Sequence, residues 1–307
     1  MMMTWRRGVE KGAIFSSLMV LFVLLRSGDA RQPSSNEAPR MNNASFNNNG
    51  AFFHCADDGI DNLSLDSIRK TLIGLEDTII YSLIERAKLP LNSPAYDSSH
   101  FPGFHGSLME LLVKGTESVQ AQGGRYRSPE EVPFFPDHLP PPLVHRPLNC
   151  SQDLPPAAAS VNVSKKIWDF YVNQFLPLLA AKGDDGNYAL GVASDLACLQ
   201  VLSRRIHFGK YVAEVKFRSE TEAYSAAIRE KDKDTLMNLL TDSKVEAMVK
   251  QRIEKKAKVF GQEVTLNDTS NSNDYKVDPS LVSRLYDEWV IPLTKDVEVE
   301  YLLRRLD

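Results

Sequence analysis

Cysteine is scarce in this 307-residue sequence, and its three copies, Cys55, Cys150 and Cys198, lie far apart with no C-x-x-C pair. This spacing excludes a zinc knuckle, a thioredoxin-like motif and a disulfide framework, because at most one disulfide could form. A basic excess is also lacking, since 36 Lys and Arg residues stand against 40 Asp and Glu residues. A chain of net charge −4 has no electrostatic footprint for a phosphate backbone, so we expect no nucleic-acid partner.

Motifs that hold cofactors or activate nucleophiles are missing as well. The sequence contains no G-x-x-x-x-G-K-[ST], G-x-G-x-x-G, H-E-x-x-H or G-x-S-x-G. Its six histidines include no Glu-x-x-His pair, which disfavours a di-iron helical bundle. We therefore expect neither a cofactor nor a metal ion.

No hydrophobic run is long enough to span a bilayer, and the N-terminal one, residues 13–25, has only 13 residues. It follows Arg6, Arg7 and Lys11, an arrangement typical of a signal peptide. We interpret residues 1–30 as a signal-peptide-like segment that directs the chain to the secretory pathway or endoplasmic reticulum, with no stable membrane span in the mature domain. A cytosolic location, an uncleaved anchor and a mistaken gene start are alternatives, and a plastid transit peptide is disfavoured because the run is too apolar.

Helical periodicity dominates the rest of the chain. Residues 31–60 are rich in Asn and Ser, and we expect a disordered linker there. From Leu65 onward apolar residues recur at steps of three and four, and no stretch sustains an alternation of period two. The pattern predicts an all-α domain over 61–307, a bundle of about eight or more helices. The predicted helices cover residues 65–90, 107–122, 164–182, 190–217, 220–231, 233–241, 243–260 and 278–306, the last kinked by Pro292.

A cationic stripe follows one face of the segment 202–217. Arg205 and Lys216 are 11 residues apart, so at 100° per residue they point within about 20° of the same direction. Gly209 and Val212 lie between them on that stripe. A glycine there could leave a recess for a small dianion between the two cations. Alternatively, the cations are solvated ends of an amphipathic face and Gly209 allows close helix packing.

Two glutamates near the C-terminus, Glu246 and Glu298, have two possible roles each. Glu246 fits the S-x-x-E capping box that begins at Ser243, in which its carboxylate would cap its own helix. Thr294 and Glu298 are four residues apart, so both point the same way from the last helix. The apolar neighbours of Glu298 predict partial burial, which would keep its carboxyl protonated as a hydrogen-bond donor. The alternative is an exposed Glu298 paired with Arg305 or Lys295.

Four segments together resemble the eukaryotic AroQ-type chorismate mutases, most closely the plant branch: residues 65–87, 128–137, 202–217 and 291–306. The likeness extends in order over about 60–307. It implies an all-helical homodimer in which each subunit holds its own active site. It also implies the rearrangement of chorismate to prephenate, on the route to phenylalanine and tyrosine, without a cofactor.

The resemblance also implies roles for individual residues. The two arginines that bind the substrate carboxylates match Arg69 and Arg205, the lysine on the ether oxygen matches Lys216, and the glutamate on the substrate hydroxyl matches Glu246. The threonine and glutamate of the last helix match Thr294 and Glu298. Position 242 is Asp242, where fungal relatives place an asparagine.

These residue types suit the reaction. Chorismate is a dianion that must adopt a compact chair, so two fixed arginines lower the entropy cost of reaching that conformer. Negative charge then develops on the ether oxygen, where Lys216 and a protonated Glu298 can stabilise it.

The regulatory site of the family has weaker equivalents here. Regulated relatives bind tyrosine or tryptophan through two adjacent basic residues and a Gly-Ser step. The corresponding positions read Gly124-Arg125 and Ala189-Leu190, and Glu76 belongs to the same set, so we expect a degenerate effector site.

One further function is considered: a catalytically inactive helical interaction protein on the same fold. That hypothesis predicts loss of the charged site residues. It is disfavoured because all six of Arg69, Arg205, Lys216, Glu246, Thr294 and Glu298 are present.

Overall fold

The structure is a computed structural model that describes residues 63–103, 105–144, 154–262 and 275–307. In these four ranges the all-α prediction is confirmed, and the only extended pairing is an isolated bridge between Gln262 and Tyr275. The predicted signal-like segment and linker lie outside the described residues, as do two of the three cysteines. The third, Cys198, is buried and free.

Twelve α-helical segments occur within the described residues, against eight predicted ranges. Three of the predicted helices are each divided in two, and the short segment 156–159 lies outside every predicted range. They are α1 (Leu65–Ala87), α2 (Leu108–Gln122), α3 (Pro156–Ala159), α4 (Ser164–Phe170), α5 (Leu176–Leu179), α6 (Tyr188–His207), α7 (Gly209–Ser219), α8 (Thr221–Glu230), α9 (Lys233–Leu240), α10 (Ser243–Gly261), α11 (Pro279–Leu285) and α12 (Ile291–Leu303). None of these helices is both long and apolar enough to cross a membrane.

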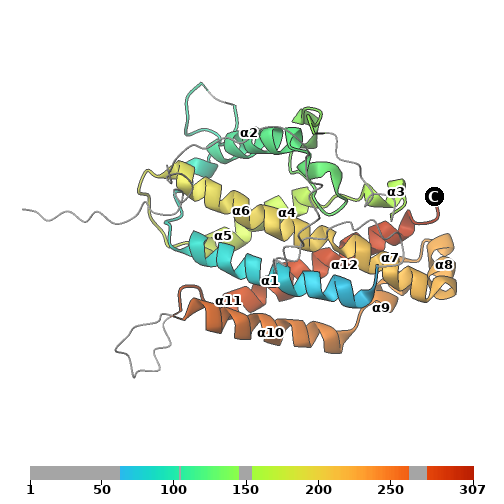
Figure 1. Cartoon of the computed structure of the whole chain (residues 1–307). Coiled ribbons are helices and arrows are strands. Elements are labelled where there is room, and N and C mark those ends of the chain that lie inside the picture. The colour runs from blue at the N-terminus through green and yellow to red at the C-terminus, as the bar shows by residue number, and fades with distance from the viewer. Residues whose placement is uncertain (1–62, 104, 145–153, 263–274) are drawn as a thin grey trace, which may run out of the picture. The chain divides into compact units, whose positions relative to one another are not determined.

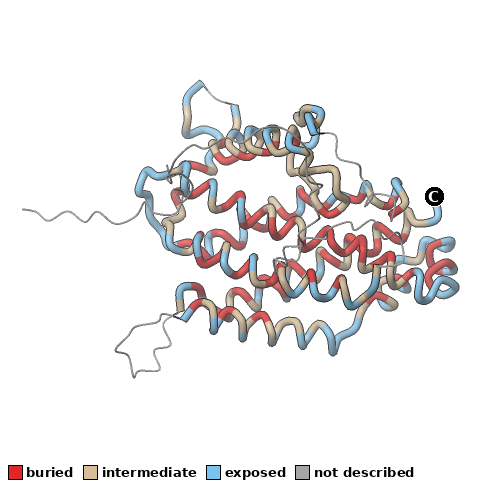
Figure 2. The backbone as a smooth tube through the Cα atoms, viewed as in Figure 1, coloured by how far each residue is buried: buried red, intermediate tan, exposed pale blue. Residues whose placement is uncertain are grey.

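The long helices pack in layers around α6 and α12. Figure 1 shows α2 on one side of α6 and α1 on the other, with α10 and α11 beyond α1. Buried residues lie on the facing sides of α1, α6 and α12, while α10 is mainly exposed or half-buried along its length (Figure 2). The hydrophobic core therefore lies between α1, α6 and α12, and α10 packs at its edge.

Two predicted helices contain a π-helical turn immediately before a proline. The turn η6 (Tyr171–Phe175) precedes Pro177 in α5, and the turn η7 (Tyr286–Val290) precedes Pro292 in α12. Proline lacks an N–H, and its ring crowds the carbonyl four residues earlier, so a widened turn accommodates it. The kink expected at Pro292 is thus a π turn that begins six residues upstream of it.

A buried ion pair between α1 and α6 has a structural role. Arg86 of α1 and Asp195 of α6 pair with both side chains fully buried. The hydroxyl of Tyr171 donates to the same carboxylate at 2.9 Å, and Tyr96 donates to it as well. Because every member has a partner, this network fastens α1 to α6.

Candidate active site

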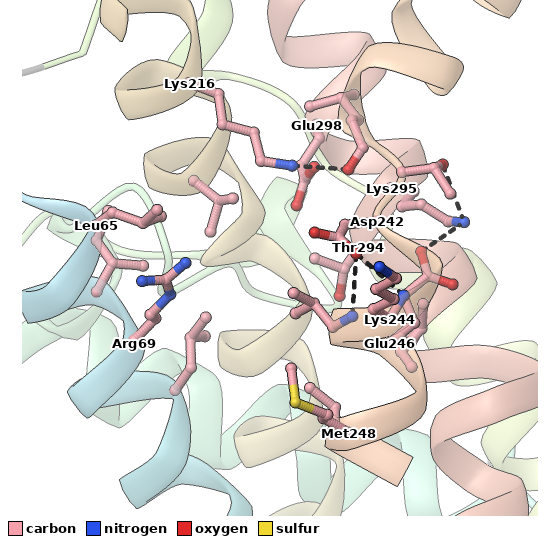
Figure 3. Close-up of a pocket in the computed structure, with 18 of the residues that line it drawn as sticks. Leu65, Arg69, Lys216, Asp242, Lys244, Glu246, Met248, Thr294, Lys295 and Glu298 are labelled. Carbon is pink, nitrogen blue, oxygen red and sulfur yellow. Dashed lines mark hydrogen bonds and ion pairs between the residues drawn. The ribbon is translucent and has the colours of Figure 1, made fainter.

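A cavity of about 1200 Å³ is lined by residues of α1, α6, α7, α8, α9, α10 and α12 and of the connection between α9 and α10 (Figure 3). The seven residues matched to the family's site all line it: Arg69, Arg205, Lys216, Asp242, Glu246, Thr294 and Glu298. The helix faces identified in the sequence therefore line one common cavity.

Arg205 is the most constrained cation of the cavity. It lies in the last turn of α6 with 7% of its surface exposed, and its Nη1 donates to the Thr294 hydroxyl at a long 3.4 Å. That hydroxyl donates in turn to the Val290 carbonyl at 2.6 Å. The buried Nε of Arg205 donates to no described atom. A buried guanidinium with spare donors requires an acceptor, and an anionic ligand provides one.

Two further cations line the cavity from two different helices. Arg69 extends from α1, with 56% of its side chain exposed and Asp66 3.2 Å away (Figure 3). Lys216 lies on α7, where its Nζ donates to the Leu240 carbonyl at 2.7 Å. An ammonium has three donors, so this bond fixes Lys216 in place and leaves donors for a ligand.

Gly209 does not form the recess that its position on the stripe suggested. A Cβ there would lie 2.9 Å from the Thr294 carbonyl oxygen and 3.3 Å from the Glu298 Cγ. The space beside the glycine is filled by α12, so Gly209 allows close packing and forms no recess. The solvated ends of that alternative are wrong, because Arg205 is buried and both cations line the cavity. The glycine lets α12 approach α7 closely, bringing Glu298 near Lys216.

Glu298 has the buried setting that its apolar neighbours predicted. It is 5% exposed, and burial raises the pKa of its carboxyl to about 7. Lys216, Arg205 and Lys295 oppose this rise through their positive charges, and Glu246 adds to it. The alternative of an exposed Glu298 paired with a basic neighbour is wrong.

The capping interpretation of Glu246 is also wrong, because a different residue caps α10. Asp242 is the N-cap, and its Oδ1 accepts from the backbone N–H groups of Lys244 and Val245 at 3.0 and 3.1 Å. The Glu246 carboxylate is therefore not needed at the helix end. It lies 3.0 Å from the Nζ of Lys295 on α12.

Glu76 lines the same cavity, whereas the other residues matched to a regulatory site, Gly124, Arg125, Ala189 and Leu190, do not. The Glu76 carboxylate is 1% exposed and is held by two cations of α10, Arg252 at 2.6 Å and Lys256 at 3.1 Å. These pairs join helices 176 and 180 residues apart in sequence, where no local motif could indicate them.

Sequence reasoning missed three cations that line the cavity, Lys244, Arg252 and Lys295. With them, six cations and five carboxylates line it. When Glu298 is protonated, the lining carries a net charge of +2. That balance suits a small dianion.

The comparisons with known proteins agree with this geometry. Residues 192–299 match the family model "Chorismate mutase type II". Chorismate mutase 2 of Petunia hybrida is 57% identical over 250 residues, which cover 80% of this chain and 95% of the relative. The cytosolic chorismate mutase 2 of Zea mays is 54% identical over 252 residues, covering 81% of this chain and 98% of the relative.

The secretory prediction for residues 1–30 is wrong. The maize relative is cytosolic, and relatives from Arabidopsis thaliana at 49% and 50% identity are chloroplastic. The prediction depended on the length and polarity of one short apolar run, which do not separate a signal peptide from other N-terminal segments.

Solved structures give the same answer as the sequences. The crystal structure of AtCM1 with tyrosine bound in its allosteric site superposes with a TM-score of 0.71 at 49% identity, covering 80% of this chain and 98% of that one. The chloroplast chorismate mutase of Zea mays also gives a TM-score of 0.71, at 47% identity, covering 82% and 98%. The predicted resemblance is thus confirmed over most of the chain, and this chain belongs to the chorismate mutase family.

Proposed function

We propose that this chain is a chorismate mutase that converts chorismate to prephenate in the synthesis of phenylalanine and tyrosine. The observation that carries the proposal is one cavity in which Lys216 and the buried Arg205 and Glu298 meet, where burial raises the pKa of the Glu298 carboxyl to about 7. An intramolecular rearrangement needs a fixed conformer and stabilised charge, and this lining offers both.

In this proposal the two arginines bind the two carboxylates of the substrate. Arg205 has an unused donor in a buried setting, and Arg69 extends toward the cavity from α1. Lys216 and protonated Glu298 donate to the ether oxygen, where negative charge develops as the C–O bond breaks. Glu246 accepts from the substrate hydroxyl, and Thr294 orients Arg205. Asp242 acts mainly as the cap of α10, since its Oδ1 is engaged by the backbone there.

The direct test adds chorismate to the purified chain and follows its loss together with the appearance of prephenate. We expect conversion far above the spontaneous rate. A chain carrying Lys216→Ala, purified in parallel, controls for mutase carried over from the expression host. Absence of conversion would favour the inactive interaction protein instead.

We further propose that the chain forms a homodimer through the outer side of α2. Leu111 and Val119 of α2 are 45% and 69% exposed, and Leu190 at the start of α6 is 51% exposed. Exposed apolar side chains gathered on neighbouring helices are typical of subunit contacts. We expect light scattering to give about twice the chain mass of 34.4 kDa. The pair of substitutions Leu111→Lys and Val119→Lys should give a monomer, whereas Val259→Lys on α10, 61% exposed, should leave the mass unchanged.

The effector site is proposed to be inactive. Gly124 has a φ of +83°, a conformation that favours glycine over the basic residue of regulated relatives. The remaining Arg125 is occupied within the chain, donating to Glu131 at 3.0 Å and Gln200 at 2.8 Å. A lost charge-assisted bond is worth about 1.5–3 kcal/mol, as much as a typical allosteric coupling energy.

We therefore expect millimolar tyrosine or tryptophan to change the initial rate less than about twofold at sub-saturating chorismate, since the coupling energy would be nearly lost. The measurement is the initial rate with and without each amino acid. Activation or inhibition of several fold would show that an effector site persists.

A further inference from the structure

We propose that Lys295 is a positioning residue for Glu246, holding its carboxylate at the cavity wall between α12 and α10. The inference rests on the proposed function, in which Glu246 accepts from the substrate hydroxyl. The sequence suggests Lys295 only as an ion-pair partner of an exposed Glu298, and a role toward Glu246 does not follow from it.

The geometry places Lys295 where three segments meet. It directly follows Thr294 on α12, and its Nζ lies 3.0 Å from Glu246 Oε1 and 3.5 Å from the Thr241 hydroxyl (Figure 3). That hydroxyl donates to the Met237 carbonyl at 2.7 Å, in the last turns of α9. One ammonium therefore connects α12 with the end of α9 and the first turn of α10.

Glu246 depends on this contact because its own helix supports it poorly. In α10 the first buried side chain is that of Ile253, nearly two turns after Glu246. Among the described residues, Lys295 is the only cation within 4.0 Å of the Glu246 carboxylate. The pair is shielded, with 22% and 29% of the two side chains exposed, so it holds its geometry better than a fully exposed ion pair.

Lys295 also acts on the electrostatics of the neighbouring carboxyl. Glu298 is faced by Lys216 of α7, Arg205 of α6, Tyr224 of α8, Glu246 of α10 and Lys295 of its own helix. Lys295 lowers the pKa of Glu298, and Glu246 raises it. Loss of the Lys295 charge therefore moves the ionisation of Glu298 to higher pH.

The test compares Lys295→Met with Lys295→Arg and with a matched control, Lys250→Met. Lys250 also ties α10 to the C-terminal helices, 2.8 Å from Asp287 of η7, but it does not line the cavity. We expect Lys295→Met to lower kcat/KM about tenfold, because one polar contact to the substrate is then misplaced. We also expect the alkaline limb of its pH profile to move to higher pH. Lys295→Arg should recover most of the activity, and Lys250→Met should leave both unchanged.

A double-mutant cycle with Glu246→Gln separates positioning from a direct role. If Lys295 acts through Glu246, adding Lys295→Met to Glu246→Gln should cost less than about twofold, far below its cost alone. Provided that the wild-type chain converts chorismate, any of three results would overturn the inference. These are fully additive losses in the double mutant, an equal loss of activity in Lys250→Met, and an alkaline limb that does not move in Lys295→Met. Failure of the wild-type chain to convert chorismate would overturn the proposed function, and this inference with it.

Discussion

Replacement of Lys216 with alanine is expected to lower kcat by about 100- to 1000-fold with little change in KM. Removal of one preorganised donor from a developing oxyanion typically has an effect of this size. In the substrate the ether oxygen carries little charge, so the ammonium gains most of its interaction energy in the transition state. The Leu240 carbonyl, 2.7 Å from Nζ, holds the ammonium in place before the charge appears.

Steady-state kinetics on chorismate measure both constants. Lys166→Ala is the control, because Lys166 forms an ion pair with Asp296 of α12 but is 61% exposed and lies outside the cavity. The control should keep wild-type kcat. A rise in KM at unchanged kcat would contradict the role assigned to Lys216, because that result marks a contact made equally in the ground state.

The value of kcat/KM should fall as the pH rises through about 7, following the ionisation of Glu298. Burial raises the pKa of this carboxyl to about 7, so below that pH it is protonated and donates, and above it the carboxylate repels the dianion. If only the protonated form works, activity two pH units above the pKa is about one hundredth of the plateau.

The matched variant is Glu298→Gln, which keeps a donor at every pH. Its kcat/KM should vary much less between pH 6 and 9, and it should exceed the wild-type value at the alkaline end. The measurement is a pH profile of both proteins in a buffer series of constant ionic strength. An identical alkaline limb in the two profiles would assign that limb to another group.

Helices and their faces were predictable because they depend on local periodicity. The spacing of apolar residues gave α1, α2 and α10 to within about three residues of their observed ends. Interruptions were less visible, since the break at Phe208 and the two π turns depend on how glycine and proline are accommodated against neighbouring helices. A local pattern cannot show that accommodation.

The site was predictable only in part. The stripe from Arg205 to Lys216 and the pair Thr294 and Glu298 follow from helical geometry, whereas their convergence followed from resemblance to a family. Gly209 shows the limit well: both interpretations fit the sequence, and the position of α12 decides between them. The ion pair between Glu76 and Arg252 joins helices far apart in the chain, so a local pattern could not predict that the Glu76 carboxylate is paired.

The scarcity of buried residues in the first half of α10 bears on how the site is maintained. None of the residues 243–252 is fully buried, and a helical segment with few buried contacts opens locally at a smaller free energy than a well-packed one. We therefore expect the amide protons of residues 243–252 to exchange with solvent faster than those of α1 or α6. A ligand that reaches Glu246 would then suppress this opening, and part of its binding free energy would be spent on ordering the wall. On this expectation, substrate entry moves the wall formed by α10 and leaves the better-buried walls formed by α6, α7 and α12 in place.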